Sequence, residues 1–416
     1  MVSVGTDSRT MTEIVTAFVR HRGEVLLVRR PLDNETAPGR WDGVSAPVEG
    51  SNSRIDDARR VVTDRLGLSE LPLAYAGESS MSTEDGHERT IHPVLFDSPH
   101  RDIEAVDDEV VEWAPATAIL DRETVPGLWE AYEQVAPSPT RIAADTIHGS
   151  AALSIHSLEV LRDRAAVTDD FETVAETALE LQDARPSMAV LTNRINRVMT
   201  AAGHSTGAVH DRAIEEIDAA VNADADAAST AAERLSGPIA TLSWSGTVRD
   251  TLTQLGEKVT VAESQPNREG IDLAEFLAAA GVDVTVMTDA ALPAVLSDRS
   301  FGAVLVGADT ILPNGDLINK VGTRALALAA DRVDVPMYVV AARDKVSTDD
   351  TFHGEHGPED QIYDGSESIS VRNPIFDLTP GSLITGVITE DGLLDQRGIS
   401  VVAAQHRSNT DWVDNV

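Results

Sequence analysis

Residues 301–328 contain polar side chains of the kinds that bind and transform oxygen-rich small molecules. A carboxylate can move a proton, and an amide next to an ammonium can hold the oxygen atoms of a phosphorylated polyol. The alternative is a solvated loop whose Asp and Asn side chains only form turns. The residues concerned are Asp309, Asn314, Asp316, Asn319 and Lys320.

Lysine is rare in this chain, and its positions favour the ligand site. It occurs only at positions 258, 320 and 345, so Arg makes up the rest of the 33 basic residues. Lys320 and Lys345 both follow predicted strands, at the end of a parallel sheet where ligands bind. A compact ammonium retained at these two positions indicates phosphate binding.

A parallel sheet is needed to bring these side chains together. After residue 237, short apolar segments alternate with helical patterns such as 271–280 and 323–330, which predicts a parallel sheet covered on both faces. The apolar segment 303–306 ends at Gly307, and this change from strand to loop to helix is typical of ligand sites in such sheets. The predicted strands are 239–242, 259–262, 282–287, 303–306, 337–342 and 383–388.

Composition limits the function further. A chain of 416 residues is long enough for two or three domains. Its formal net charge is −36 at pH 7 and its isoelectric point is near 4.5. Such an acidic, lysine-poor composition resembles that of proteins from salt-loving archaea. It offers no basic surface for nucleic acid, so we expect no nucleic-acid partner.

The absence of cysteine excludes disulfides, thiolate nucleophiles and Cys-ligated metals, and it fits a reducing compartment. No apolar segment approaches the length of a membrane span, and the N-terminus lacks the pattern of a signal peptide. We therefore expect a cytoplasmic protein that does not bind membranes.

The N-terminal part begins with a polar tail, residues 1–12, and continues with strand patterns. Segments 14–19 and 25–28 flank a Gly-containing turn and predict a β-hairpin. A helix is predicted from about Ser53 to Leu66, with Ser53 as N-cap and Gly67 at its C-terminal end. Further strands at 89–96 and 109–113 and a closing helix at 126–135 would complete a domain over residues 13–137.

Residues 41–68 resemble the signature loop and helix of the Nudix hydrolase family. The signature aligns without gaps when Arg60, Val62, Gly67 and Leu68 take its Arg, apolar, Gly and apolar positions. The resemblance implies an α/β/α sandwich.

The family's metal-binding glutamates are missing. They hold the divalent ions that activate water against a pyrophosphate. One Asp beside an Arg is a poor site for such ions, so we expect a degenerate Nudix domain without hydrolase activity. Ala46 stands for the signature's Gly, and Asn52, Val61, Asp64 and Arg65 stand for its four Glu positions.

Residues 138–237 predict a helical bundle. Apolar stripes within 171–179 and 188–199 have helical spacing, and we interpret them as core. Thr168 or Asp169 is the expected cap of the first of these helices. We expect about four helices, the last of them interrupted or frayed in the Ala- and Asp-rich run 223–228.

Residues 141–406 are similar to the superfamily that joins the α, β and δ regulatory subunits of initiation factor 2B with methylthioribose-1-phosphate isomerase and ribose-1,5-bisphosphate isomerase. The resemblance implies the architecture of that superfamily, a helical bundle over 138–237 followed by a Rossmann-like domain over 238–416. The segments that carry it are 185–187, 241–245, 263–266, Glu269-Gly270, 307–309, 314–316, 319–323 and Lys345.

The resemblance also implies roles for individual residues. The isomerases use a cysteine and an aspartate as acid and base; Asp309 matches the aspartate, whereas Ser243 stands in the place of the cysteine. A serine hydroxyl has far too high a pKa to replace the thiol without a partner base. His148 falls where these isomerases usually carry a phosphate-binding Arg. The residues expected to bind the ligand are Gly149, Arg185, Ser245, Asn319, Lys320 and Lys345.

Three functions are compatible with the sequence. The first is a member of the regulatory group, to which residues 241–248 look closer, that binds a phosphorylated sugar or nucleotide without converting it. The alternative is an aldose-1-phosphate isomerase acting on ribose 1,5-bisphosphate or methylthioribose 1-phosphate, which Asp309 favours and Ser243 disfavours. The third is a Nudix hydrolase.

His353 and His356 have a spacing found in metal sites, but no third ligand is close in sequence. We interpret them as polar surface and expect neither a metal nor a cofactor. The second resemblance implies a homodimer or larger homo-oligomer, since members of that superfamily assemble through their C-terminal domain. It also implies a protein partner in translation for the first of the three functions.

Overall fold

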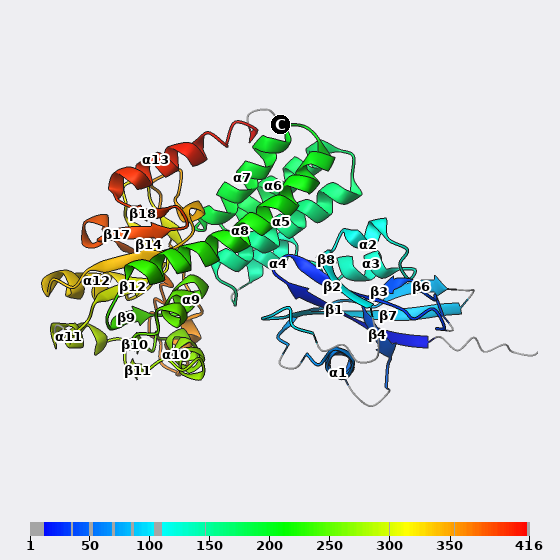
Figure 1. The fold of residues 1–416 in the computed structure, drawn as a ribbon, viewed down its shortest axis with the longest axis horizontal. Coiled ribbons are helices and arrows are strands. Elements are labelled where there is room, and N and C mark those ends of the chain that lie inside the picture. Colours follow the sequence, from blue (N-terminus) through cyan, green and yellow to red (C-terminus); the bar gives the residue numbers. More distant parts are fainter. Residues whose placement is uncertain are drawn as a thin grey trace, which may run out of the picture. The chain divides into compact units, whose positions relative to one another are not determined.

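The computed structural model describes residues 12–34, 36–49, 53–68, 71–84, 87–103, 110–145, 147–298, 300–352 and 354–413. It forms two compact units, Met1–Ser138 with Arg162–Val167, and Pro139–Leu161 with Thr168–Val416 (Figure 1). Residues 1–11 of the predicted tail, Asn52 and His353 lie outside the described residues.

A mixed sheet forms the centre of the first unit. β1 (Thr12–His21) pairs antiparallel with β2 (Glu24–Arg29), which confirms the predicted hairpin, and parallel with β7 (His87–Asp97). The strand order is β3-β2-β1-β7-β5, with β4 on β1, β6 on β7 and β8 on β2. The other strands are β3 (Trp41–Asp42), β4 (Val44–Pro47), β5 (Leu73–Ala76), β6 (Ser80–Glu84) and β8 (Val110–Pro115).

Helix α1 (Arg54–Leu66) confirms the predicted helix and both of its ends. The Ser53 hydroxyl accepts a hydrogen bond from the Asp56 N–H at 3.1 Å. Gly67 ends the helix with a left-handed φ of 66°. The closing helix is shorter than predicted, α3 (Leu128–Glu133), because Gly127 with φ of 79° precedes it, and α2 (Ala118–Asp121) lies before it.

Helices cover both faces of this sheet. Val15, Ala17 and Val19 of β1 belong to the core cluster that contains α1, whereas Phe18 belongs to the cluster that contains α2 and α3. Successive side chains of a strand point to opposite faces, so the sheet separates two helical layers.

The second unit begins with α4 (Pro139–Ala144), α5 (Ser150–Val167), α6 (Phe171–Ala184), α7 (Ala189–Ala202) and α8 (Thr206–Arg234). The predicted cap of α6 was wrong by one residue, because Asp170 accepts the hydrogen bond from the Glu172 N–H. The predicted interruption at 223–228 was also wrong. Helix α8 is continuous there because Ala has the highest helix propensity and Ala227 and Ala228 are fully buried.

The second unit also contains the predicted parallel sheet, in the order β11-β10-β9-β12-β15-β17-β18. From β9 the chain adds strands outward in one direction, and from β12 in the other. The boundary between the neighbouring strands β9 and β12 is therefore the switch point of the sheet. Open parallel sheets bind ligands at such a point. The strands are β9 (Ile239–Leu242), β10 (Val259–Ala262), β11 (Val284–Met287), β12 (Ala303–Val306), β15 (Met337–Val340), β17 (Gly386–Thr389) and the antiparallel β18 (Gly392–Leu394).

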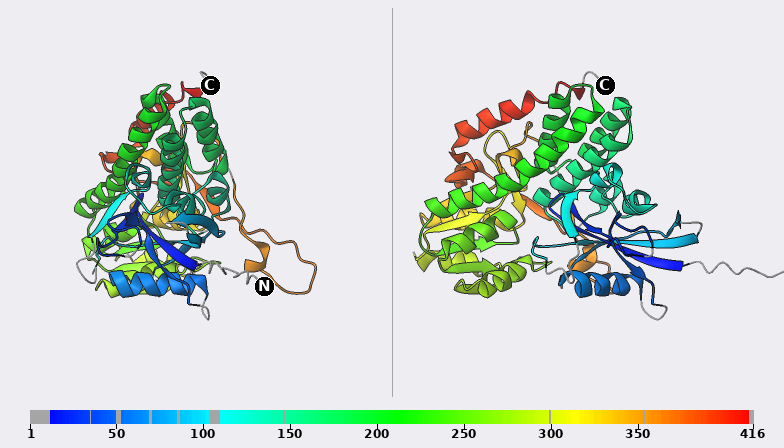
Figure 2. Two further views of the ribbon diagram at one scale, coloured as in Figure 1. Left: turned by 90° about the vertical axis from the view of Figure 1, so that its right-hand side faces the viewer. Right: turned by 45° about the vertical axis from the view of Figure 1, so that its right-hand side comes forward.

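Helices cover both faces of this sheet as well (Figures 1 and 2). One core cluster joins residues of α8, α9 (Gly246–Leu255) and α10 (Glu269–Ala279) to the strands. The other joins α11 (Leu292–Val295), α12 (Thr323–Arg332) and α13 (Gln396–Arg407) to them. Among the described residues, none of the helices is long and apolar enough to cross a membrane.

A small antiparallel sheet after β12 corrects one prediction. Asn319 and Lys320 lie on β14 (Leu317–Lys320), between β13 (Thr310–Ile311) and β16 (Phe376–Thr379), and not in a loop. Asn314 and Asp316 form the turn between β13 and β14, where the Asp316 N–H donates to Asn314 Oδ1 at 2.9 Å. For these two residues the turn-forming alternative is correct.

The connection from β15 to β16 is long. It contains two short 3₁₀ turns, η2 (Arg343–Lys345) and η3 (Glu359–Gln361). Another 3₁₀ turn, η4 (Gly381–Leu383), follows β16. Residues 358–372 of the connection from β15 to β16 are mostly exposed. This loop extends away from the sheet in the left view of Figure 2. A further turn, η1 (Leu296–Asp298), follows α11.

Candidate functional site

Asp309 follows β12 and lies at the switch point of the sheet. The Ser150 hydroxyl, at the start of α5, donates to Asp309 Oδ1 at 3.3 Å. Burial of the carboxyl group raises the pKa of Asp309, although the charge of Lys345 and the hydrogen bond from Ser150 act in the opposite direction. A carboxyl group that stays protonated at a higher pH than usual can act as a general acid.

Lys345, in the 3₁₀ turn η2 that follows β15, brings a positive charge close to Asp309. Its side chain is buried, and Nζ donates to the carbonyl oxygen of Ala308 at 2.5 Å. Sequence reasoning predicted this lysine as a phosphate-binding residue. In the structure it lies in η2 (Arg343–Lys345) and contacts the residue directly before Asp309.

Lys320 is the second lysine near Asp309, and its charge also lowers the pKa of Asp309. Nζ lies 2.5 Å from Oε1 of Glu269, the first residue of α10. Glu269 was not among the predicted site residues. The Glu269-Gly270 segment of the family resemblance was the only sequence signal that could have identified it.

The helical bundle contributes Gly149 and Arg185 to the same region. Gly149 is the N-cap of α5, directly before Ser150. Arg185 Nε donates to the Ile142 carbonyl at 3.1 Å, and Nη1 lies 3.6 Å from Glu355 Oε2. The charge of Glu355 acts on Asp309 and raises its pKa, which places this ion pair close to the carboxyl group.

His148 is engaged in a local ion pair. Its Nδ1 lies 2.7 Å from Asp145 Oδ2. Burial would raise the pKa of Asp145, but hydrogen bonds from the His148 ring and from the N–H groups of His148 and Ile147 hold the pKa well below its usual range. His148 therefore fixes the loop before Gly149, and Asp145 stays ionised.

The loops after β9 and β12 meet closely at the switch point. Ser245 caps α9, its hydroxyl accepting from the Val248 N–H at 3.4 Å. A Cβ at Gly307 would lie 2.7 Å from the Ser245 hydroxyl oxygen, so the two loops approach this closely only with glycine at 307. Ser245 is thus brought to the segment that carries Asp309.

Ser243 lies in the same loop with a left-handed φ of 63°. Its N–H donates to the Ser264 hydroxyl at 2.7 Å. Within the described part of the chain, no side chain forms a hydrogen bond with the Ser243 hydroxyl. Among the residues that the structure describes, no base is therefore in contact with this hydroxyl.

Asn319 is buried, and its Nδ2 donates to the Thr323 hydroxyl at 3.0 Å. This contact joins the end of β14 to the start of α12. Of the predicted residues, Gly149 precedes the Ser150 that contacts Asp309, and Lys345 contacts the Ala308 carbonyl directly before it. Lys320 acts on Asp309 by its charge, and Arg185 pairs with Glu355, whose charge also acts on Asp309. Ser245 lies against Gly307, and the amide nitrogen of Asn319 donates within the fold.

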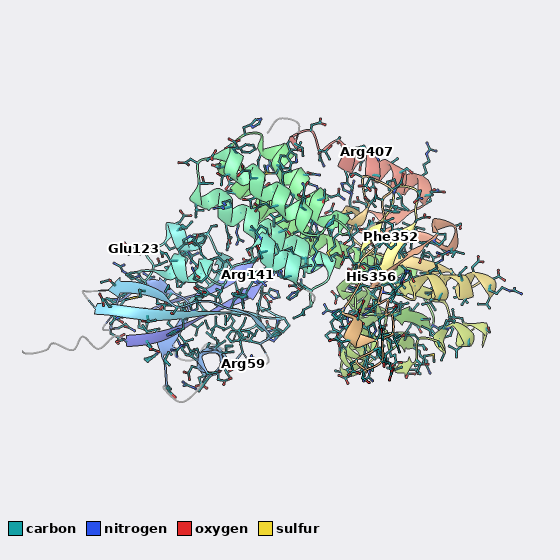
Figure 3. All side chains as sticks on the ribbon, turned by 180° about the vertical axis from the view of Figure 1, so that it is seen from behind. Arg59, Glu123, Arg141, Phe352, His356 and Arg407 are labelled. Atoms are coloured by element: carbon teal, nitrogen blue, oxygen red, sulfur yellow. The ribbon has the colours of Figure 1, made fainter. Side chains whose placement is uncertain are left out.

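An open cavity of about 570 Å³ adjoins this region. Phe352 and His356, labelled in Figure 3, lie in the connection between β15 and β16 and form part of its wall. Among the residues that the structure describes, no group of three or more His, Cys, Asp or Glu side chains is arranged to hold a metal ion. The cavity is lined by Ala184, Arg185, Pro186, Phe352, Gly354, Glu355 and His356.

A buried ion network holds the turn that carries Lys345. Arg194 Nε lies 3.1 Å from Asp344 Oδ2, and Arg197 contacts the same carboxylate. Burial would raise the pKa of Asp344, but the two arginines lower it to about 2. Asn193 Nδ2 donates to the carbonyls of Asp344 and Val346, both at 2.8 Å. Sequence reasoning identified only the apolar stripe of this helix as core and missed the network formed by its polar residues.

In the first unit, Arg60 of the Nudix resemblance pairs with two acidic residues that lie outside the signature's Glu positions. Arg60 Nη2 lies 3.3 Å from Glu49 Oε2 and 3.4 Å from Asp57 Oδ1. Val61 is buried in the core beside α1, and Arg65 donates to the Ser45 carbonyl at 3.4 Å.

Comparisons with known proteins place the second unit in a family. Residues 146–396 match the Initiation factor 2 subunit family, and the match does not extend to the Nudix resemblance at 41–68. The methylthioribose-1-phosphate isomerase of Geobacillus kaustophilus (strain HTA426) is 31% identical over 328 residues, which covers 68% of this chain and 92% of that protein.

Solved structures share the fold. The translation initiation factor eIF-2B of Pyrococcus horikoshii OT3 has a TM-score of 0.55 and 27% identity, covering 62% of this chain and 94% of that chain. The tetrameric eIF2B-β2δ2 complex from C. thermophilum has a TM-score of 0.52 and 20% identity, covering 67% of this chain and 94% of that chain. Relatives with this fold thus include a subunit of an oligomeric assembly. Because the family match spans more than half of its length, the chain belongs to the Initiation factor 2 subunit family.

Proposed function

We propose that the second unit isomerises a phosphorylated aldose at the site around Asp309. The observation that carries the proposal is a carboxyl group whose burial raises its pKa, next to the buried ammonium groups of Lys320 and Lys345. A site that only binds a sugar phosphate needs the cations but has no use for a buried carboxyl group beside them. The similarity to a methylthioribose-1-phosphate isomerase supports the same conclusion.

Each residue has a role in this proposal. Asp309 donates a proton to the sugar, and Lys320, Lys345 and Arg185 attract the phosphate by charge. The N–H groups at the start of α5, after Gly149, add donors of the kind that bind anions. The substrate is of the type of ribose 1,5-bisphosphate or methylthioribose 1-phosphate.

The experiment is a turnover assay of the full chain over a panel of sugar 1-phosphates in high salt. The wild type should isomerise at least one of them, and Asp309→Asn should lower kcat by about 10²–10⁴-fold, since an amide keeps the shape but cannot transfer the proton. Binding of the sugar phosphate to Asp309→Asn should be retained. A wild type that binds sugar phosphates but converts none of them would contradict the proposal.

The second candidate is a regulatory subunit that binds a phosphorylated sugar or nucleotide without turnover. The Ser243 hydroxyl, which no base contacts among the described residues, favours this candidate. Binding without conversion across the whole panel would establish it. A protein partner in translation belongs to this candidate.

For the first unit, 13–137 in the predicted division, we propose a degenerate Nudix domain. The side chains at two of the Glu positions support this, because the buried apolar Val61 and the guanidinium of Arg65 cannot bind a divalent ion. Nucleoside diphosphate derivatives with Mg²⁺, added to the same panel, should give no turnover. For the second unit we retain the division into a bundle, 138–237, and a ligand-binding domain, 238–416.

A further inference from the structure

The proposed isomerisation needs two groups that transfer protons. One must give a proton to the ring oxygen as the ring opens, and another must take the proton from the hydroxyl on C2 as the carbonyl forms there. Asp309, whose pKa is raised, suits the first step. Ser243 cannot perform the second, because no base contacts its hydroxyl among the described residues.

Most carboxylates around the switch point have both oxygens occupied. Glu355 accepts from the Ser187 hydroxyl on Oε1, and its Oε2 is paired with Arg185. Asp289 accepts the N–H groups of Ser264 and Gln265 on its two oxygens.

Asp377 is occupied in the same way. Its carboxylate accepts the N–H groups of Gly322 at 2.8 Å and of Arg324 at 3.2 Å, at the start of α12. Burial raises the pKa of Asp377, although these hydrogen bonds oppose the effect. Both of its oxygens are engaged by backbone donors, so neither is left to face a substrate hydroxyl.

Glu269 differs from all of them. Its Oε1 is held by Lys320 Nζ at 2.5 Å and by Asn267 Nδ2 at 3.2 Å. Its Oε2 is buried and has no hydrogen-bond partner among the described residues. Buried polar atoms are rarely left without a partner, so an unoccupied carboxylate oxygen in this position indicates a ligand group.

The backbone fixes Glu269 at this place. Gly270 packs against the end of β10 so closely that a Cβ there would lie 1.8 Å from the Ala262 carbonyl oxygen. The first turn of α10 is thereby held against the sheet, at the edge that carries the loops of Ser243 and Asp309. Lys320 connects the two carboxyl groups, since it pairs with Glu269 and its charge acts on Asp309.

We propose that Glu269 is the second proton-transfer residue of this site and performs the step that the family cysteine performs elsewhere. This inference rests on the proposed function. As the ring opens, the bond from C1 to the ring oxygen breaks, and that oxygen takes the proton of Asp309. The hydrogen on C2 moves to C1 with its electron pair, and Glu269 Oε2 takes the proton of the C2 hydroxyl, which leaves a carbonyl at C2. C1 is reduced and C2 oxidised, so no other reactant is needed.

The test uses the full chain and a sugar 1-phosphate that the wild type converts. Glu269→Gln keeps an oxygen for Lys320 but cannot accept the proton, so kcat should fall by about 10²–10⁴-fold while KM stays within about 3-fold. In this variant, kcat should no longer decrease toward acidic pH. Formate added to Glu269→Ala should restore part of kcat with increasing concentration, because it supplies a small carboxylate in the space left by the side chain.

Two variants serve as controls. Asp272→Asn removes an exposed carboxylate one turn along α10 and should leave kcat unchanged. Glu263→Gln tests the carboxylate of Glu263, which competes with Glu269 for the role of proton acceptor. Glu263 Oε2 lies 3.9 Å from Arg268 Nε.

The outcomes separate this inference from the proposed function. If Asp309→Asn loses activity while Glu269→Gln keeps kcat within about 3-fold of wild type, the role of Glu269 is wrong and the isomerase function stands. A loss confined to Glu263→Gln, or a Glu269→Ala variant that formate cannot restore, also contradicts the inference. If the wild type converts no sugar 1-phosphate, both the function and the inference fail.

Discussion

At the scale of single residues, Lys345, which we predicted to bind phosphate, also forms a hydrogen bond within the fold. The sequence indicated a free ammonium for phosphate. In the structure the ammonium is buried and already donates to the Ala308 carbonyl. The two roles are compatible, since an ammonium has three donors, and a buried one binds an anion strongly because little water competes for it.

We predict that Lys345→Met weakens sugar phosphate binding by about 1.5–3 kcal/mol, the range for a hydrogen bond to a charged group. The melting temperature of the unliganded protein should fall as well, because the Ala308 carbonyl loses its donor. Titration calorimetry and thermal unfolding measure the two effects.

The matched control is Lys258→Met, which removes the same charge from an exposed lysine paired loosely with Asp283 at 3.7 Å. It should change neither quantity. Equal loss of affinity in both variants would show that only the long-range charge of Lys345 matters, and would contradict a direct contact with phosphate.

At the scale of elements, helices α7 and α8 are joined to the site through buried charges. Arg197 of α7 pairs with Glu216 of α8 and with Asp344. Burial raises the pKa of Glu216 to about 7, an effect that Asp344 increases and Arg197 and Arg194 oppose. The folded state therefore holds a proton on Glu216 between about pH 4.5 and 7 that the unfolded chain releases.

Because the folded-state pKa is raised, Glu216 contributes stability at low pH that is lost as the pH rises to 7 and above. Glu216→Gln cannot ionise, so its unfolding free energy relative to wild type should rise between pH 5 and pH 8. The rise should be at most about 3 kcal/mol, since one pKa unit corresponds to about 1.4 kcal/mol. Denaturant unfolding at both pH values measures it.

Glu215→Gln is the control for this prediction, because Glu215 is the neighbouring exposed carboxylate on the same helix and pairs with Arg212. Its change of unfolding free energy between the two pH values is the baseline with which the change in Glu216→Gln is compared. His406 titrates in the opposite direction, since burial lowers its pKa, so only the difference between variants isolates Glu216.

At the scale of the whole molecule, the family resemblance of residues 141–406 implies an assembly of two or more copies of this chain. We predict a homodimer or larger for the full chain, as members of closed symmetric assemblies usually bury one face against a second copy. Light scattering at several salt concentrations measures the mass, because a chain of charge −36 repels itself most at low salt. A monomer under all conditions would contradict the prediction.

Several features of the fold could be predicted from local sequence alone. The apolar runs of β9, β10 and β12 and the caps of α1 depend on nearest neighbours and on hydrophobic periodicity, and the structure has them where the sequence places them. The predicted break in α8 was wrong because burial of Ala227 and Ala228, which the composition of the run does not reveal, supports the helix.

Part of the candidate site could likewise be predicted from the sequence, and the rest depends on the tertiary structure. Residue types identified Asp309 and Lys345 as chemically able, because a carboxyl and an ammonium after parallel strands meet at one edge of a sheet. The sequence could not show that Ser150 would contact Asp309, or that Lys320 would pair with Glu269, because these partners are 159 and 51 residues apart in the chain. Burial, which raises the pKa of Asp309 and leaves Glu269 Oε2 without a partner, arises only when bundle and sheet pack together, and so only the tertiary structure decided it.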